Sequence, residues 1–120
     1  NNQINLKMKK SLYIIFALIT LIGNAQNSLE DLLKKYNDNG VPYITVEELA
    51  SPKTQAIIFD TREPKEFKVS HLENAVCVGY DNFDIAKVEK LHPNKNKKIV
   101  VYCSLGIRSE TIGKKLMKAG

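Results

Sequence analysis

The sequence predicts an α/β fold built on a parallel β-sheet. Three apolar runs of four residues have the pattern of strands buried on both faces: Ala56–Phe59, Ala75–Val78 and Ile99–Tyr102. Helix-forming segments and turn residues separate these runs along the chain. Because parallel strands need crossover connections and helices provide them, this alternation predicts a parallel α/β sheet.

Three elements are expected before the first apolar run. They are a helix over Leu29–Tyr36, a short strand at Tyr43–Ile44 and a short helix that ends at Ala50. Ser28 is expected to cap the first helix, and Asn39-Gly40 to end it. Thr45 and Glu48 have the spacing of a capping box, which predicts the start of the short helix.

Three further helices are expected between and after the runs. They cover Pro64–Phe67, Asp84–Leu91 and Ser109–Ala119. A proline suits the first turn of a helix, which supports the start at Pro64. In the last helix the spacing predicts that Ile112, Leu116 and Met117 face inward and the lysines outward.

The composition is that of one ordinary globular domain. The chain has 120 residues, of which 43% are apolar and 26% charged, and this excludes collagen-like and disordered proteins. Two cysteines are too few for a disulfide scaffold, and two cysteines with two histidines are too few for a convincing zinc site. We therefore expect no metal and no other cofactor.

The N-terminal residues have the pattern of a secretory signal peptide. Met8-Lys9-Lys10 forms a short basic start, and an apolar run follows over Ser11–Ile22. Gly23-Asn24-Ala25 offers small residues for cleavage near Ala25. The run is shorter than the ~20 residues that span a membrane, although an uncleaved anchor is the alternative interpretation. No cysteine lies at the cut, which argues against a lipoprotein anchor.

Much of the net positive charge of the chain lies in the expected signal segment. The formal net charge of +5 falls to +2 when the three lysines of residues 1–25 are removed. The other lysines at residues 95–98 and 114–118 lack the interleaved aromatic residues that stack on bases. We therefore expect a solvated surface and no nucleic-acid partner, in a protein located in the periplasm or outside the cell. Membrane contact is expected only through an uncleaved signal segment.

Two predicted strands are followed at their carboxyl ends by residues that could act in catalysis or binding. In parallel sheets, functional sites lie beyond the carboxyl ends of the strands. One end, Cys103–Ser109, connects an apolar strand directly to a helix. A loop of this kind points successive backbone N–H groups inward and forms a nest for an anion. Gly106 permits a dihedral angle that side chains disfavour, and Arg108 adds a planar cation. The nest, Arg108 and the N-terminus of the following helix all favour a thiolate, so Cys103 is the predicted nucleophile.

These segments resemble the rhodanese-like domain family. Residues 103–109 have the pattern Cys-x-x-Gly-x-Arg-Ser, and residues 60–67 have the pattern Asp-x-Arg-Glu-x-x-Glu-Phe. Residues 70–75 and 44–49 are similar to two further family segments. The resemblance implies a three-layer parallel-sheet domain over residues 41–120. An N-terminal helix in residues 26–40 and the signal segment would precede it.

The resemblance implies sulfurtransferase chemistry. Cys103 would attack the sulfane sulfur of a small anionic donor such as thiosulfate, become a persulfide, and pass the sulfur to cyanide, a thiol or a protein. Arg108 would steady the loop and the donor. The loop residues whose amides would cradle the sulfur are Ser104, Leu105, Gly106, Ile107 and Ser109.

Four other residues have a functional and a structural interpretation. The resemblance places Asp60 and Arg62 near the loop, where they would shape the charge of the site, while the alternative is a structural ion pair. His71 is expected to pack and to hydrogen-bond a turn rather than to act as a base. Cys77 is expected to be a buried free thiol, although a disulfide with Cys103 would silence the enzyme.

Two other functions stay open. Cysteine phosphatases and arsenate reductases hold their anion in a Cys-x5-Arg loop, whereas four residues separate Cys103 from Arg108 and favour a single sulfur atom. A rhodanese-like module that carries sulfur or binds a protein with little turnover is the second alternative.

The chain departs from the family pattern in two places. Ser70 stands where the family has Gly, and Glu73-Asn74 stands where it has Pro-Gly. The family continues beyond the position of Gly120 with one strand, a Gly-Gly turn and a final helix. The resemblance therefore implies a fragment that lacks its last strand and helix.

Overall fold

The chain is described by a computed structural model over residues 8–11, 13 and 28–120. The expected signal segment lies almost entirely outside the described residues. The chain divides between Tyr36 and Asn37, and the sheet lies in the unit Asn37–Gly120. Before the division, residues 28–36 are helical, which confirms the predicted helix and includes Ser28 in it. None of the described helices is long and apolar enough to cross a membrane.

The sheet is parallel, as the alternation of strands and helices predicts. Its strands are β1 (Ala56–Asp60), β2 (Val76–Cys77) and β3 (Lys98–Tyr102), in the order β2-β1-β3. Both outer strands pair with the central strand in parallel, and Asp60 lies between Cys77 and Tyr102 in the register. The carboxyl ends of all three strands therefore meet at one edge of the sheet.

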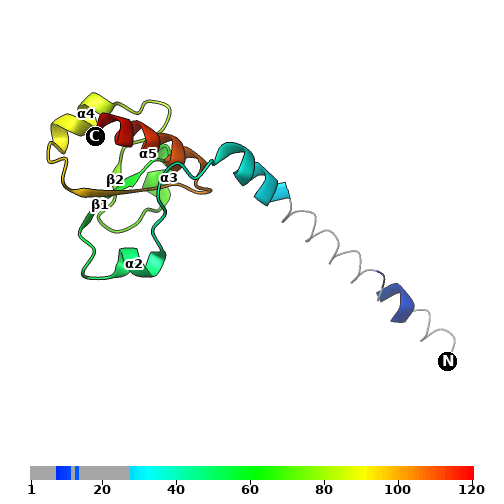
Figure 1. Cartoon of the computed structure of the whole chain (residues 1–120). Coiled ribbons are helices and arrows are strands. Elements are labelled where there is room, and N and C mark those ends of the chain that lie inside the picture. The colour runs from blue at the N-terminus through cyan, green and yellow to red at the C-terminus, as the bar shows by residue number, and fades with distance from the viewer. Residues whose placement is uncertain (1–7, 12, 14–27) are drawn as a thin grey trace. The chain divides into compact units, whose positions relative to one another are not determined.

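Helices lie on both sides of this sheet (Figure 1). They are α2 (Val46–Ala50), α3 (Pro64–Val69), α4 (Ile85–Leu91) and α5 (Ile107–Ala119). Thr45 caps α2 by accepting a hydrogen bond from the Glu48 amide at 3.1 Å, which confirms the predicted helix start. Asp84 caps α4 through the amides of the first turn. Side-chain caps satisfy donors that a helix start leaves unpaired.

The core lies where β1 and β3 pack against α4 and α5. Phe59 of β1 and Ile112 of α5 are fully buried, while Val88 of α4 and Val100 of β3 are each 8% exposed. The Phe59 ring also meets the His92 ring edge-on, with centroids 5.3 Å apart. Burial of these side chains away from water is the main favourable term that holds the helices on the sheet.

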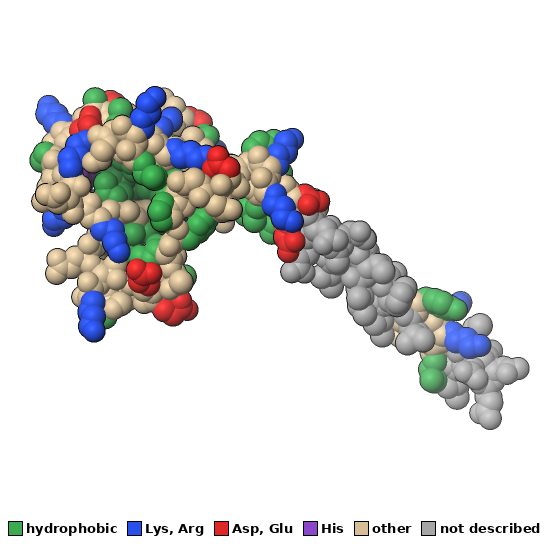
Figure 2. Space-filling model, in the orientation of Figure 1, with side chains coloured by type: hydrophobic (Ala, Val, Ile, Leu, Met, Phe, Trp, Pro, Cys, Tyr) green, Lys and Arg blue, Asp and Glu red, His purple; other side chains and the backbone are tan. Residues whose placement is uncertain are grey.

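Burial is less complete than the apolar runs predict. Only Phe59 and Asp60 of β1 are buried, and Val76 in the two-residue strand β2 is 37% exposed. Lys98 and Ile99 of β3 are also exposed. β2 and β3 lie at the two edges of the described sheet, whereas β1 lies between them and its first three residues are half-buried. Figure 2 shows apolar side chains gathered in a recess on the face of the unit that is turned to the viewer.

Two further expectations are wrong. Tyr43–Ile44 is not a strand, because the segment pairs with no strand in the described residues. Tyr43 instead lines a hollow together with Ser109 and Glu110 of α5. Met117 does not face inward, because it is 58% exposed. In a helix with 3.6 residues per turn, Leu116 falls on the face of the buried Ile112 and Met117 falls well away from it. The helices α3 and α5 are also longer than predicted, by two residues each.

The burial of α5 predicts a contrast between two of its apolar residues. Ile112→Ala removes a fully buried side chain and is expected to lower the free energy of unfolding by about 2–5 kcal/mol. Met117→Ala at an exposed position is expected to change it by less than about 0.5 kcal/mol. Urea unfolding of the full chain measures both. Equal losses in the two variants would contradict the described orientation of α5.

Candidate active site

The predicted loop joins β3 to α5 and carries a half-buried cysteine. Cys103 follows the last residue of β3, and α5 begins at Ile107 with Gly106 as its N-cap. Gly106 has φ of +86°, in the left-handed region that is costly for residues with a Cβ atom. This turn brings the amide of Gly106 back toward the sulfur. The positive φ that the turn requires explains why a glycine is needed at this position.

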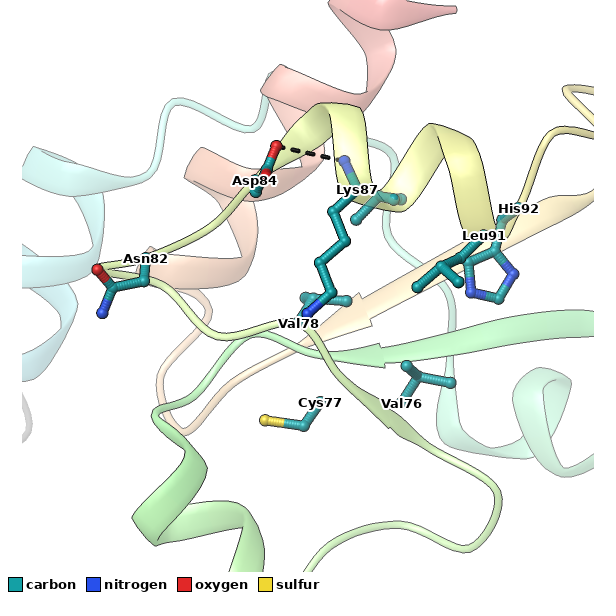
Figure 3. A pocket seen from close by; sticks show the side chains of 9 residues that line it. Val76, Cys77, Val78, Asn82, Asp84, Lys87, Leu91 and His92 are labelled. Carbon is teal, nitrogen blue, oxygen red and sulfur yellow. Dashed lines mark hydrogen bonds between the residues drawn. The ribbon is translucent and has the colours of Figure 1, made fainter.

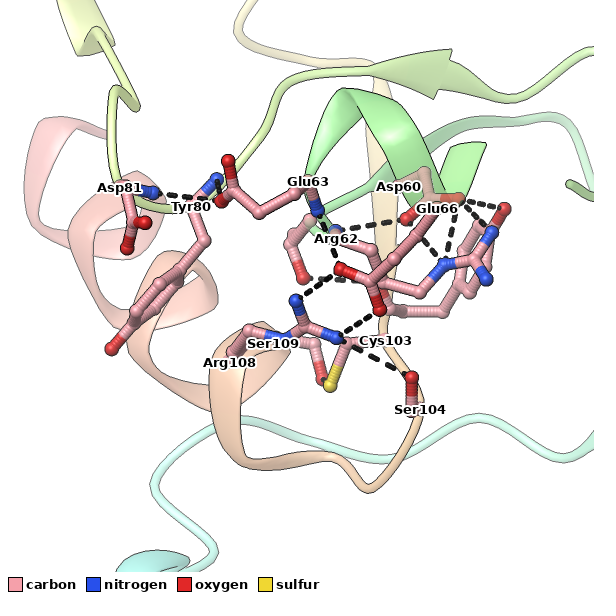
Figure 4. A network of polar contacts seen from close by, with 12 residues as sticks. Asp60, Arg62, Glu63, Glu66, Tyr80, Asp81, Cys103, Ser104, Arg108 and Ser109 are labelled. Carbon is pink, nitrogen blue, oxygen red and sulfur yellow. Dashed lines mark hydrogen bonds and ion pairs between the residues drawn. The ribbon is translucent and has the colours of Figure 1, made fainter. Parts of the chain in front are cut away.

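Hydrogen-bond donors surround the sulfur of Cys103. The Gly106 N–H donates to Sγ at 3.1 Å, and the Ser109 hydroxyl lies 3.5 Å from Sγ (Figure 4). Burial raises the pKa of the Cys103 thiol, but hydrogen bonds from the Ser109 hydroxyl and from the amides of Ser109, Leu105 and Gly106 outweigh that effect. The pKa therefore lies below its ordinary value, as expected for a thiol at a helix N-terminus.

Arg108 has a partner that sequence reasoning did not identify. Its guanidinium binds the Glu66 carboxylate through two bonds of 2.7 and 2.9 Å and also donates to the Ser104 hydroxyl at 3.3 Å. Glu66 belongs to α3, so this fork-to-fork pair ties the helix to the cysteine loop. The only signal for Glu66 in the sequence is its place in the Asp-x-Arg-Glu-x-x-Glu segment, because the contact joins residues 42 positions apart.

The Glu66 carboxylate is strongly stabilised in its charged form. The hydrogen bond from Arg108 is the main cause, and the Glu63 amide, which donates at 3.0 Å, adds to it. Together they lower the pKa of Glu66 to about 2. The guanidinium of Arg108 is thus already paired with a carboxylate. Its main role in the structure is to position the loop rather than to bind a free anion.

A second ion pair, between Asp60 and Arg62, forms the other wall of the site. Asp60 is fully buried and accepts from Arg62 through the backbone N–H at 2.9 Å and Nη2 at 2.6 Å. The Tyr102 hydroxyl also donates to Asp60 at 2.5 Å. Burial raises the pKa of Asp60, but these bonds outweigh it and the pKa falls below its ordinary value.

This pair fastens the strand ends to residues 70–72. Arg62 Nη2 also donates to the Ser70 carbonyl at 2.6 Å, and the Leu72 amide donates to the Tyr102 hydroxyl at 3.1 Å. The contacts support the structural interpretation of Asp60 and Arg62, and they also place Arg62 beside the loop. Glu63 is held in a structural way as well, because its carboxylate accepts the amides of Tyr80 and Asp81.

An open hollow of about 270 Å³ lies beside the sulfur. Its lining residues are Arg62, Ser70, His71, Leu72, Tyr102, Cys103 and Ser104. His71 holds its Nδ1 2.8 Å from the Phe67 carbonyl and stacks on the Phe67 ring with centroids 3.7 Å apart. These contacts agree with the packing interpretation of His71. Arg62 and Cys103 both line the hollow, so it joins the Arg62 side chain to the cysteine loop.

Cys77 belongs to a different hollow and does not pair with Cys103. Both cysteines are free thiols. Cys77 and Tyr102, the residue before Cys103, flank Asp60 of β1 on opposite sides. Their Cα atoms are therefore two strand spacings, about 10 Å, apart, whereas the Cα atoms of a disulfide lie ~4.4–6.8 Å apart. Cys77 instead lines a cavity of about 80 Å³ between β2 and α4 (Figure 3). Burial is the main cause that raises the pKa of Cys77.

Metal binding finds no support in the part of the chain that the structure describes. No group of three His, Cys, Asp or Glu side chains gathers there in a way that could hold an ion. The site is therefore described by its thiol, its amides and its two ion pairs.

Comparisons with known proteins place the chain in a family. The family model of the rhodanese-like domain matches residues 45–120. A tRNA uridine(34) hydroxylase of Escherichia coli O1:K1 / APEC is 43% identical over 58 residues, and one of Enterobacter sp. (strain 638) is 41% identical over 58 residues. Each match covers 46% of this chain and 17% of the relative, so the matched segment is a small part of those longer proteins.

The depressed pKa of Glu66 predicts how the stability depends on pH. The Glu66–Arg108 pair contributes above the ordinary glutamate pKa of about 4.3, and its contribution is lost as the pH falls toward about 2. Glu66→Gln is therefore expected to be less stable than the wild type at pH 7, with a difference that shrinks between pH 4.5 and 2. Urea unfolding at several pH values measures this difference.

The matched control is Glu89→Gln on α4, which breaks an exposed ion pair with Lys95. Its effect on stability is expected to be small at every pH, because exposed pairs contribute little. A Glu66→Gln deficit of constant size from pH 7 to pH 2 would contradict the assignment of the charge to Glu66.

Proposed function

The chain belongs to the rhodanese-like domain family, and from that premise we propose that it is a sulfurtransferase that carries sulfur as a persulfide on Cys103. The observation that carries the proposal is the environment of the thiol. Cys103 lies half-buried at a strand end, with the Gly106 amide 3.1 Å from its sulfur and a pKa below the ordinary value. A thiolate is the nucleophile that sulfur transfer requires.

The reaction has two steps with thiosulfate as the donor. In the first, the Cys103 thiolate attacks the outer sulfur of thiosulfate, the sulfur–sulfur bond of the donor breaks, and sulfite leaves with the bonding electron pair. In the second, an acceptor such as cyanide or a thiolate attacks the outer sulfur of the Cys103 persulfide. The persulfide bond then breaks, and Cys103 leaves as the thiolate that began the cycle.

The loop residues assist by stabilising negative charge on sulfur. The amides of Ser104 to Ser109 can hold the outer sulfur of the persulfide in the way that an oxyanion hole holds oxygen. Arg108, fixed by Glu66, keeps the loop in place while the charge moves. The donor anion would enter through the hollow that Arg62 lines. Asp60 fixes that guanidinium by three of its side-chain contacts.

The names of the relatives support a second candidate. The 43% identity to tRNA uridine(34) hydroxylases fits a cysteine-bearing module within a larger protein that acts on tRNA. Three of the six lysines at residues 95–98 and 114–118 are paired with acidic residues: Lys95 with Glu89, Lys98 with Glu48 and Lys114 with Asp38. Because tRNA binding needs unpaired cations that contact phosphates, these pairs favour sulfur transfer to a small acceptor or a protein.

Export belongs to the same proposal. The basic start, the apolar run and the small residues before residue 26 support removal of a signal peptide near Ala25. The mature protein would then work in the periplasm or outside the cell, where thiols oxidise readily. The separation of Cys77 from Cys103 protects the enzyme there from an internal disulfide.

Intact mass spectrometry after incubation with thiosulfate tests the function. The wild-type chain and the matched variant Cys77→Ser are each expected to gain one sulfur atom, which cyanide then removes. Cys103→Ser is expected to gain none. No gain on a folded chain with a free Cys103 thiol would overturn the sulfurtransferase proposal. A persulfide that forms but persists with cyanide and thiol acceptors would identify a sulfur carrier with little turnover.

A further inference from the structure

We propose that residues 37–43, named here the strap, are a positioning element that holds the cysteine loop in its reactive conformation. The strap precedes residue 45, where the match to the family model begins. It lies in the same compact unit as the loop. The inference rests on the proposed function in one respect, because it concerns the same sulfur, but its evidence is a separate set of contacts.

The strap is closed on itself by a buried asparagine. Asn37 is only 8% exposed, its Nδ2 donates to the Tyr43 hydroxyl, and its Oδ1 accepts the Asn39 amide at 3.1 Å. Asn39 has φ of +56°, which lets the chain reverse between Asn37 and Tyr43. A buried polar side chain with its bonds satisfied defines one local conformation, since losing a partner would leave the amide unpaired.

The closed end of the strap lies on Gly106. A Cβ atom on Gly106 would lie 3.5 Å from Asn37 Nδ2 and 3.8 Å from Tyr43 Oη, which is van der Waals distance. Asn37 and Tyr43 therefore cover the outer side of the residue whose N–H donates to the Cys103 sulfur. A hollow of only about 40 Å³ remains between the strap and the start of α5.

A buried carboxylate joins the middle of the strap to the same glycine. Glu110 of α5 is 4% exposed and accepts the Gly40 amide at 2.7 Å. The Glu110 backbone N–H in turn donates to the Gly106 carbonyl at 3.0 Å. Lys114 lies 3.6 Å from Glu110 and 2.5 Å from Asp38, so it adds a cation between the helix and the strap.

The strap also depends on a glycine of α5. A Cβ atom on Gly113 would lie 2.9 Å from Val41 Cγ2 and 3.1 Å from Cγ1, closer than side chains normally approach. Alanine at residue 113 would push Val41 outward while it raised the helix propensity of α5. This substitution therefore displaces the strap without touching the loop, which gives a probe at a distance from the sulfur.

These contacts predict that loosening the strap weakens the hydrogen bonds to sulfur. The left-handed conformation of Gly106 directs its amide at Cys103, and a glycine without neighbours is free to leave that conformation. Loss of an N–H bond to a thiolate raises the thiol pKa. Asn37, Tyr43 and Glu110 are thus positioning residues, because they act on the sulfur through Gly106.

The test is the pH profile of Cys103 alkylation by iodoacetamide in the full chain with Cys77→Ser. Asn37→Ala, Tyr43→Phe and Gly113→Ala are each expected to shift the profile to higher pH and to slow alkylation at pH 7 about three- to tenfold, where tenfold corresponds to one pKa unit. Lys118→Ala, at an exposed position of α5, is the control and is expected to keep the wild-type profile.

The outcomes separate this inference from the proposed function. Strap variants that keep the native circular dichroism spectrum and the wild-type alkylation profile would overturn the inference. If Asn37→Ala does not fold, Tyr43→Phe, which removes one hydroxyl group, decides the result. A shifted profile in a chain that never gains sulfur from thiosulfate would support the strap and overturn only the sulfurtransferase proposal.

Discussion

The left-handed turn at Gly106 is the constraint on which the site depends. β3 ends at Tyr102 and α5 begins at Ile107, so the chain must reverse within four residues. A positive φ at Gly106 completes the reversal and directs an amide at the Cys103 sulfur from 3.1 Å. The same geometry places the start of α5 beside the sulfur. Charge stabilisation by fixed dipoles follows from the backbone path alone and needs no neighbouring base.

Two ion pairs hold the surroundings of this turn. Asp60 and Arg62 connect the end of the central strand to residues 70–72, while Glu66 and Arg108 connect α3 to the loop. Asp60 is fully buried, so breaking its pair with Arg62 would leave an uncompensated buried charge, whereas the Glu66–Arg108 pair is half-buried. Their effect is therefore to fix where the loop and the open hollow lie. The strap contacts at Gly106 are proposed to serve the same purpose.

The parts of the fold that follow from neighbouring residues could be predicted, and those that follow from distant contacts could not. The succession of an apolar strand, Cys103, Gly106 and Arg108 is local, and it predicted both the loop and its left-handed glycine. The prediction of a strand at Tyr43–Ile44 was wrong, because two apolar residues do not indicate whether the segment has a strand to pair with. Met117 was misplaced because its apolar character was weighed above its spacing, which puts it well away from the face of the buried Ile112. The Glu66–Arg108 pair joins residues far apart in the chain, which no spacing rule connects.

Backbone amides at the loop stabilise the Cys103 thiolate and hold the pKa of the thiol below its ordinary value. The direct measurement is the rate of Cys103 alkylation against pH in the Cys77→Ser chain. The rate follows the thiolate fraction and is half-maximal at the pKa of the thiol. We expect a midpoint below the ordinary cysteine value of about 8.5, because the amides stabilise the thiolate. A midpoint at or above that value would contradict this expectation and show that burial outweighs the hydrogen bonds.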